Sequence, residues 1–414
     1  MQSVCLYFKV HQPFQLKRYH AKDIDLLHSY EDVEADMAVI NTLADECYLP
    51  ANEIILSNIL KSNGKFKVSF SISGTVLELL LLHRPDVIDS FKQIFATGCA
   101  EILSETYYNS LSYLYSKNEF QRQVQKHHAL INELFGLSPV VFRNTELIYD
   151  NKLSHYLDGM GLKGILCEGA TEILKDRSPN HVYSTVDNGE MKLLLRNHVL
   201  SDDIAFRFDD TRWNEHPLTA DKFADWIQQH PEGTDVINLF MDYETFGIHK
   251  KKETGIFDFL DALPIEVLKD ANTAFSLPSE VIAKNSAKDV FDVPHTISWE
   301  NNSGKLNPWG ENVMQNNTLK KIYSLENIVK KSRNEEALET WGKLQASDYF
   351  HFMAKEEAKG ENYKYVNPFD SAQEIYQYYT NIVFDFEIDL IRRGIVELKK
   401  SSSTDNWNLL HHHN

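Results

Sequence analysis

Two carboxylate side chains that follow strongly apolar segments are the clearest candidates for chemistry in this sequence. Glu146 comes shortly after the apolar run 140–142, and Asp242 directly follows the apolar run 236–241. A carboxylate at the mouth of a buried strand is costly to desolvate unless it is paired or takes part in a reaction. Two such groups suit glycoside hydrolysis, in which an ionised carboxylate attacks the anomeric carbon and a protonated one assists the leaving oxygen.

Both carboxylates also have simpler interpretations. Arg143 could neutralise Glu146 in an ordinary salt bridge. Asp242 and Glu244 could together bind a divalent cation, but no matching set of His or Asp residues is spaced around them, and we predict no metal site. The sequence contains no GxSxG, P-loop, GxGxxG or HExxH pattern, and we predict no cofactor.

Six further residues could contact a hydroxylated ligand, because each is a polar or aromatic side chain close to an apolar segment: His11, Gln12, Glu105, His198, Trp213 and Asp348. A His-Gln pair after a strand can hydrogen-bond to hydroxyl groups, and a tryptophan can stack on a sugar face. Packing is an equally simple role for Trp213. Asp348 lies among aromatic residues in a helical region, which suggests that this region closes one wall of the site.

The elements that must position these residues alternate between strand-like and helix-like segments over about the first 300 residues. The predicted strands are 1–10, 66–72, 140–142, 164–167, 193–196, 236–241 and 290–293, and the predicted helices include 76–96, 120–135 and 219–229. This alternation favours an α/β fold with a parallel sheet of barrel type. In such folds, polar residues that follow the carboxyl ends of strands are the first candidates for catalysis.

The sequence changes character after about Pro308, where apolar residues recur at helical spacing in the segments 319–329 and 375–390. Ser371 and Glu374 fit a capping box at the start of the second segment. We therefore predict three regions: a barrel over 1–305, a helical bundle that completes the active site over 306–400, and a disordered tail over 401–414.

The composition limits the partners and the location of this chain of 414 residues. Its formal net charge of −18 argues against nucleic acids and anionic membranes, because both reward clustered Lys and Arg. The N-terminus does not resemble a signal peptide and no apolar stretch reaches about 18 residues, so we predict a cytoplasmic protein. The four cysteines, at positions 5, 47, 99 and 167, lie far apart and are predicted to be buried free thiols.

These motifs, in this order, resemble glycoside hydrolase family 57, an amylase-like family of α-glucan enzymes. The resemblance covers nearly the whole chain and rests on five segments: His11-Gln12-Pro13, the stretch 98–108, and the segments around Glu146, Asp242 and Asp348. One such motif would be weak evidence, whereas five in register are specific.

The resemblance implies a distorted barrel of seven β/α units, followed by a helical region that contributes to the active site. It implies a retaining mechanism with Glu146 as the nucleophile and Asp242 as the general acid/base. His11 would bind sugar at the base of the pocket, and the helical region would supply Asp348. The length fits the shorter, α-amylase-like branch of the family.

The sequence departs from the family pattern at two places. Tyr243 stands where many members have a glycine. The segment 143–145 replaces an approach to the nucleophile that contains tryptophan in many relatives. Both catalytic carboxylates are retained, so these departures concern the specificity group and not the presence of activity.

We therefore expect a retaining, α-amylase-type hydrolase whose partner is an α-1,4-glucan or a maltooligosaccharide. A 4-α-glucanotransferase would form the same covalent intermediate but pass the sugar to another sugar hydroxyl. Two alternatives from other classes are a catalytically silent carbohydrate-binding protein and a metal-dependent deacetylase on a related barrel. The oligomeric state is left open by the sequence.

Overall fold

A computed structural model of the chain describes residues 2–26, 28–186, 191–231, 233–299, 310, 312–354 and 367–405, with side chains as far as residue 394. The contacts divide the chain into two compact units. The first comprises residues 1–13, 34–307 and 360–366, and the second comprises residues 14–33, 308–359 and 367–414. No helix within the described ranges is both long and apolar enough to cross a membrane.

The first unit is built on strands whose bounds are β1 Gln2–Val10, β2 Val68–Ile72, β3 Ala100–Ile102, β4 Val141–Arg143, β5 Gly164–Glu168, β6 Val182–Ser184, β7 Lys192–Arg196, β8 Val236–Asp242, β9 Thr273–Phe275 and β10 Asp289–Val290. They are ordered β3-β2-β1-β8 and β10-β6-β7-β5-β4, and β9 pairs with β1. The paired strands run parallel to one another, except that β6 runs antiparallel to β7.

Two links join these groups of strands into a barrel. Ser104, which follows β3, forms a parallel bridge with Phe142 of β4. On the other side, the backbone N–H of Asn197 donates to Asn238 of β8 at 2.9 Å, and the Asn238 amide donates back to Leu195 of β7 at 2.8 Å. The closed set is β1, β2, β3, β4, β5, β7 and β8, which confirms the predicted distorted (β/α)7 barrel.

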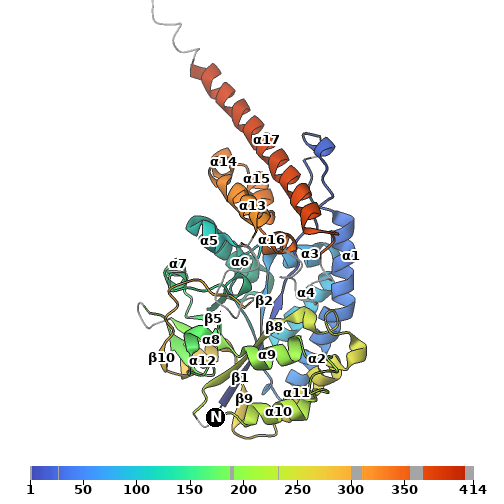
Figure 1. The fold of residues 1–414 in the computed structure, drawn as a ribbon, viewed down its shortest axis with the longest axis vertical. Coiled ribbons are helices and arrows are strands. Elements are labelled where there is room, and N and C mark those ends of the chain that lie inside the picture. Colours follow the sequence, from blue (N-terminus) through green and yellow to red (C-terminus); the bar gives the residue numbers. More distant parts are fainter. Residues whose placement is uncertain are drawn as a thin grey trace, which may run out of the picture. The chain divides into compact units, whose positions relative to one another are not determined.

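Helices surround these strands, and Figure 1 shows α2, α4, α9 and α11 among those on the outside. Their bounds are α1 Val33–Leu43, α2 Leu49–Lys61, α3 Gly74–His83, α4 Pro85–Ala96, α5 Ser112–Tyr115, α6 Lys117–Phe135, α7 Leu153–Tyr156, α8 Thr171–Leu174, α9 His198–Ala205, α10 Ala220–Gln228, α11 Ile256–Val267 and α12 Pro278–Lys284.

The predicted strands and helices are found with two corrections. The single helix expected over 76–96 is two helices, α3 and α4, because Pro85 lacks a backbone N–H and instead begins a new helix at its first position. In place of the strand expected over 290–293, the structure has the two-residue strand β10, Asp289–Val290.

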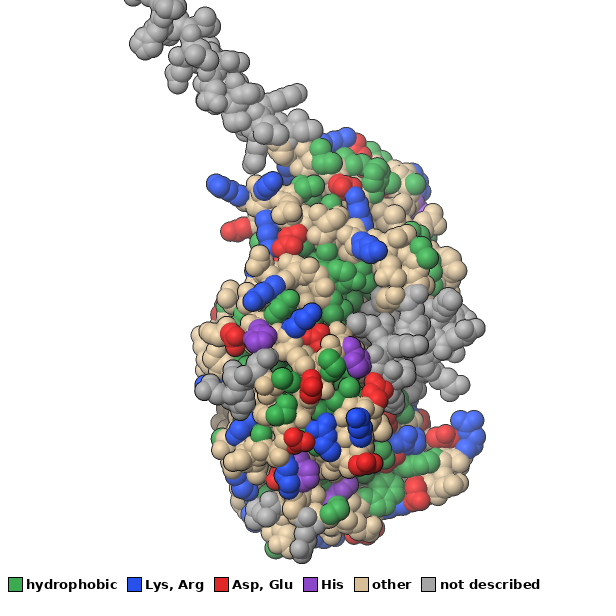
Figure 2. All heavy atoms as spheres, turned by 60° about the vertical axis from the view of Figure 1, so that its left-hand side comes forward, with side chains coloured by type: hydrophobic (Ala, Val, Ile, Leu, Met, Phe, Trp, Pro, Cys, Tyr) green, Lys and Arg blue, Asp and Glu red, His purple; other side chains and the backbone are tan. Residues whose placement is uncertain are grey.

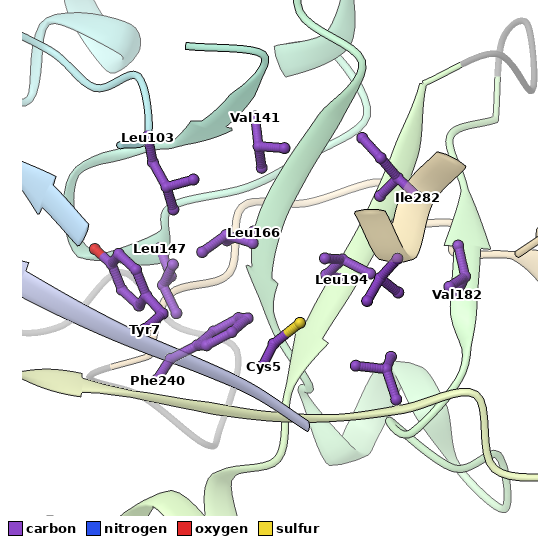
Figure 3. Packing of buried hydrophobic residues seen from close by; sticks show 12 residues of the cluster. Cys5, Tyr7, Leu103, Val141, Leu147, Leu166, Val182, Leu194, Phe240 and Ile282 are labelled. Atoms are coloured by element: carbon purple, nitrogen blue, oxygen red, sulfur yellow. The ribbon is translucent and has the colours of Figure 1, made fainter. Parts of the chain in front are cut away.

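The interior of the barrel is filled by apolar side chains, which Figure 3 shows converging from several strands. The rings of Tyr7 and Phe240 meet edge to face at 5.4 Å, and Leu166, Leu194 and Cys5 belong to the same buried cluster. A filled interior leaves the carboxyl edge of the strands as the place where a ligand can bind. The four cysteines are free thiols, although Cys99 is only half-buried, contrary to the expectation for all four.

The second unit contains the helices α13 Val313–Ser324, α14 Glu326–Ser332, α15 Glu335–Lys343, α16 Ser347–Phe352 and α17 Ala372–Asp405. The Ser371 hydroxyl accepts the Glu374 backbone N–H at 3.1 Å, as the predicted N-cap requires. The Glu374 carboxylate, however, accepts the N–H of Asp370 and not that of Ser371.

Residues 14–33 also belong to the second unit, which the expected division at residue 305 did not include. The hydroxyls of Tyr19 and Tyr30 donate to the fully buried carboxylate of Asp385 in α17, at 3.0 and 2.8 Å. The tail expected over 401–414 begins inside α17, which continues to Asp405, and residues 406–414 lie outside the described residues.

Candidate active site

Polar residues follow the carboxyl ends of all seven barrel strands: His11 and Gln12 after β1, Ser73 after β2, Glu105 after β3, Glu146 after β4, Glu168 at the end of β5, Asn197 and His198 after β7, and Asp242 at the end of β8. Because the seven strands run in the same direction, these residues share one edge of the barrel. This edge is where α/β barrels place their reacting groups.

Glu146 is held in an unusual backbone conformation. Its φ of 54° and the φ of 50° at Leu147 place two successive residues in the left-handed region, which non-glycine residues rarely adopt. Trp299 fixes this turn with two hydrogen bonds, from its backbone N–H to the Glu146 carbonyl at 3.2 Å and from its indole N–H to Glu146 Oε2 at 2.7 Å. Backbone strain of this kind is concentrated at functional sites.

Lys9 lies between the two candidate catalytic carboxylates. Its Nζ is 3.1 Å from Glu146 Oε1 and 3.8 Å from Asp242 Oδ1. These two oxygens can therefore be no further apart than the sum of the two distances. That limit is compatible with the ~5–5.5 Å separation of the two carboxyl groups in retaining glycosidases.

Arg143, which the sequence offers as one possible partner of Glu146, lies beside Glu105. Its guanidinium is 3.7 Å from Glu105 Oε2 and donates to Asn109 Oδ1 at 3.1 Å. Burial raises the pKa of Glu105 to about 7, against the opposing effect of Arg143. Glu146 accepts its hydrogen bond from Lys9, and its charge also acts on the Arg143 guanidinium. Glu105 is fully buried, which favours a role through Arg143 over direct contact with a sugar.

A second buried ion pair occupies the ends of β5 and β7. The Arg196 guanidinium contacts Glu168 at 3.4 Å and Asp202 at 2.5 Å, and its Nε donates to the carbonyl of Phe240 at 2.9 Å. Its Cζ also lies 5.7 Å from the Trp299 ring, which connects this pair to Glu146. Burial raises the pKa of Glu168 to about 7, partly opposed by Arg196.

The segment after β8 separates Asp242 from Glu244. The Asp242 side chain is 32% exposed, whereas Glu244 is buried and accepts the Tyr48 hydroxyl at 2.6 Å. Burial, and next the charge of Asp242, raise the pKa of Glu244 to about 8. Tyr243 donates to Asn52 in α2 at 2.7 Å, so this departure from the family pattern lies in the core. In the part of the chain that the structure describes, no three His, Cys, Asp or Glu residues form a group that could hold a metal.

Gly247 lies in the segment that follows Asp242 at the end of β8. We expect Gly247→Ala to lower the free energy of unfolding by more than about 2 kcal/mol. Its φ is +103°, and a Cβ there would overlap the carbonyl oxygen of Glu46. Gly136→Ala is the matched control, because its φ is +68° and nothing lies within 4 Å of the added Cβ. The control should cost only the left-handed penalty of roughly 1 kcal/mol. Urea unfolding measures both, and equal losses would contradict the steric argument.

His11 and Gln12 lie at the edge of the barrel formed by the carboxyl ends of the strands, which we call the catalytic edge, and both are buried. The His11 Nδ1 is 2.6 Å from the Ser73 hydroxyl, and the Gln12 amide donates to the carbonyl of Pro13. Asp348 is the second residue of α16, in the second unit, and is half-buried. The expected contribution of Asp348 to the active site stays a prediction.

His198 and Trp213 are brought together, but in a cavity of their own. They line a space of about 900 Å³ that also includes Asn180, Trp226 and His230 and contains none of the side chains that surround Glu146. His198 is nevertheless close to the catalytic edge, because its Nδ1 is 4.0 Å from Glu168 Oε1.

Three residues that organise the site are not predicted from the sequence: Lys9, Trp299 and Glu168. Lys9 and Glu168 could have been identified from the sequence, since each is a charged residue in a largely apolar strand. Trp299 could not, because a short antiparallel bridge between Tyr149 and Ile297 is what brings it to Glu146.

Comparison with known proteins agrees with this geometry. The model of the family described as "Glycosyl hydrolase family 57" matches residues 5–294. A curated protein of Methanocaldococcus jannaschii, named "Putative alpha-amylase", is 38% identical over 92% of this chain and 83% of its own length.

Two solved structures share the fold at low sequence identity. A family 57 branching enzyme from Thermococcus kodakaraensis is 13% identical, with a TM-score of 0.67 over 95% of this chain and 90% of its own. A 4-alpha-glucanotransferase from Thermococcus litoralis is 17% identical, with a TM-score of 0.62 over 84% of this chain and 56% of its own. With the family model covering most of the barrel and the curated relative covering most of the chain, this protein belongs to glycosyl hydrolase family 57 and is an amylase-like glycosidase.

Proposed function

We propose that this enzyme is a retaining hydrolase of α-1,4-glucans, of the α-amylase type, with Glu146 as the nucleophile and Asp242 as the general acid/base. The observation that carries the proposal is the shared contact of Lys9 with both carboxylates. It brings one oxygen of each carboxylate close to the same ammonium group, which supports direct attack by one carboxylate without an intervening water.

The environments of the two carboxylates support different roles. The Glu146 side chain is 5% exposed and receives hydrogen bonds from Lys9 and Trp299, which favour its ionised form and fix its aim. The Asp242 side chain is 32% exposed and therefore accessible to the leaving group and to water. A buried, fixed anion suits the nucleophile, and an accessible carboxyl suits the group that transfers protons.

The two steps follow from this arrangement. Glu146 attacks the anomeric carbon while Asp242 gives its proton to the glycosidic oxygen, which leaves with the bond electrons. The glycosyl ester at Glu146 is uncharged, and Asp242 is left ionised once its proton has gone to the leaving group. Ionised Asp242 takes a proton from water, whose oxygen attacks the anomeric carbon and releases Glu146.

The test is a product profile on soluble starch and maltooligosaccharides, with the anomeric configuration followed by NMR. We expect shorter products whose first-formed anomer is α. A β anomer would exclude retention, and products longer than the substrate would assign the protein as a 4-α-glucanotransferase. Binding of maltooligosaccharide with no product would support a silent binding protein, and loss of activity with a chelator would favour a metal-dependent reaction.

Lys9→Met should lower kcat for starch hydrolysis by about a hundredfold and move the acidic limb of the pH profile to higher pH. The reason is the loss of the ammonium group that donates to the Glu146 carboxylate and favours its ionised form. Lys250→Met is the matched control, because Lys250 is also a buried lysine in an ion pair, with Asp209. The control should lower Tm and leave the position of the pH profile unchanged. A Lys9 variant with the wild-type profile would contradict this role.

A further inference from the structure

A cavity beside the reaction centre is not used by the proposed mechanism. It opens between the segment after β5, the start of α9, and α10, and its volume of about 900 Å³ lies at the upper end of the ~300–1,000 Å³ range of small-molecule sites. It therefore has room for several linked sugar units. Five of its lining residues carry the argument: Asn180, His198, Trp213, Trp226 and His230.

The walls of the cavity combine aromatic faces with a fixed polar floor. The half-buried rings of Trp213 and Trp226 meet at 6.0 Å with an interplanar angle of 75°. Asn180 and Asn197 are more than nine-tenths buried, and the Asn197 amide donates to Asn180 Oδ1 at 3.1 Å. The Asn180 amide lies 3.3 Å from His230 Nδ1. Indole faces for C–H groups and neutral amide and imidazole groups for hydroxyls are what a sugar requires.

The charges of the lining favour an uncharged ligand over an anion. Both arginines that line the cavity are already paired, Arg177 with Asp289 at 2.9 Å and Arg207 with Asp203 at 2.6 Å. Of the other charged residues in the lining, Glu215 pairs with Lys222 at 2.6 Å and Lys175 is exposed. Acidic and basic side chains are likewise interspersed over the face drawn in Figure 2. A neutral polyhydroxylated chain fits this cavity better than a phosphate would.

A row of contacts places the cavity next to the reaction centre. Glu146 accepts the Trp299 indole N–H, the Trp299 ring lies 5.7 Å from Arg196, and Arg196 pairs with Glu168. One oxygen of the buried Glu168 side chain has no hydrogen-bond partner among the residues that the structure describes, and it lies 4.0 Å from Nδ1 of His198, which lines the cavity. The cavity and the reaction centre therefore share one edge of the barrel, separated by this row of side chains.

We propose that the cavity is a second binding site for α-glucan, which holds another stretch of a long chain while one glycosidic bond is cleaved beside Glu146. The proposal takes its ligand class from the proposed function. It predicts that long glucans depend on the cavity and that short oligosaccharides do not.

The test combines binding and kinetics. Calorimetry with maltoheptaose on the Glu146→Gln variant should count two sites per chain, and adding Trp213→Ala should leave one. In the active enzyme, Trp213→Ala should raise KM for soluble starch at least fivefold and leave kcat/KM for maltotriose within twofold. Phe206→Ala is the matched control, because Phe206 is an exposed aromatic residue near the end of α9 that does not line the cavity.

Several outcomes would overturn the proposal. One such outcome is a single maltoheptaose site in the Glu146→Gln variant, in which the cavity is intact. Another is a KM for soluble starch in Trp213→Ala that equals the KM of the Phe206→Ala control. Displacement of maltoheptaose from the cavity by inorganic phosphate would assign it to an anion. Trp213→Leu keeps an apolar contact with Trp226 and repeats the test if the alanine variant loses its fold. If the wild type binds maltoheptaose at two sites but forms no product, the proposed function fails and the second site stands.

Discussion

Glu146→Gln is expected to lower kcat for starch hydrolysis at least a thousandfold, equivalent to about 4 kcal/mol of transition-state stabilisation. The amide cannot form the glycosyl ester, although it preserves the shape of the side chain and can accept one of the two hydrogen bonds that Lys9 and Trp299 donate. The measurement is initial rate against starch, together with mass spectrometry of enzyme trapped with an activated glycoside. Activity within tenfold of the wild type would remove Glu146 from the mechanism.

Glu101→Gln is the matched control for this change. Glu101 is also a glutamate in the barrel whose carboxyl is buried, and burial raises its pKa to about 7. It lies within β3 and accepts the backbone N–H of Ser279 at 2.9 Å, away from the catalytic edge. Its glutamine variant should hydrolyse starch at a rate within tenfold of the wild type, so that a loss confined to position 146 reports the chemistry and not the burial.

Asp242→Ala is expected to lower kcat for starch by at least a hundredfold, and azide should restore turnover of an aryl α-maltoside at least tenfold. An aryl leaving group needs little protonation, so the glycosyl-enzyme still forms, and azide then replaces the water that Asp242 would have activated. Two inversions give the α-glycosyl azide. The products are identified by NMR.

The same reagent separates the two carboxylates. With Glu146→Ala, azide would attack the substrate directly, and a single inversion would give the β-glycosyl azide. Glu244→Gln tests the neighbouring carboxyl, whose pKa burial raises to about 8. A large loss in Glu244→Gln together with near-normal activity in Asp242→Ala would assign the proton transfer to Glu244.

The fold was predictable where side chains alternate or run apolar over several residues. The segments that became β1, β2, β4, β5, β7 and β8 carry this signal, and the polar residues that follow them identified the catalytic edge. The three-residue strand β6 carries too little periodicity to be recognised, and its antiparallel direction depends on its partner β7. The break between α3 and α4 is visible in the sequence, because Pro85 lacks a backbone N–H.

The residues of the candidate site likewise divide into those that the sequence predicts and those that it does not. Glu146 and Asp242 were predictable because a carboxylate after an apolar strand is conspicuous within the sequence. Their partners were not, since 137 residues separate Lys9 from Glu146 and 153 separate Trp299 from it. Arg143, the cation close to Glu146 in the sequence, contacts Glu105 and Asn109, whereas the distant Lys9 donates the hydrogen bond to Glu146.

By itself, the sequence determined the order of strands and helices, the family, the two carboxylates and the edge of the barrel on which they lie. These depend on the local pattern of apolar and polar residues, which acts over a few neighbours. Only the tertiary structure decided which cation lies between Glu146 and Asp242, that Trp299 holds the Glu146 side chain, and that Trp213 and His198 line a separate cavity. These depend on barrel closure, which places the ends of distant strands within hydrogen-bonding distance of one another.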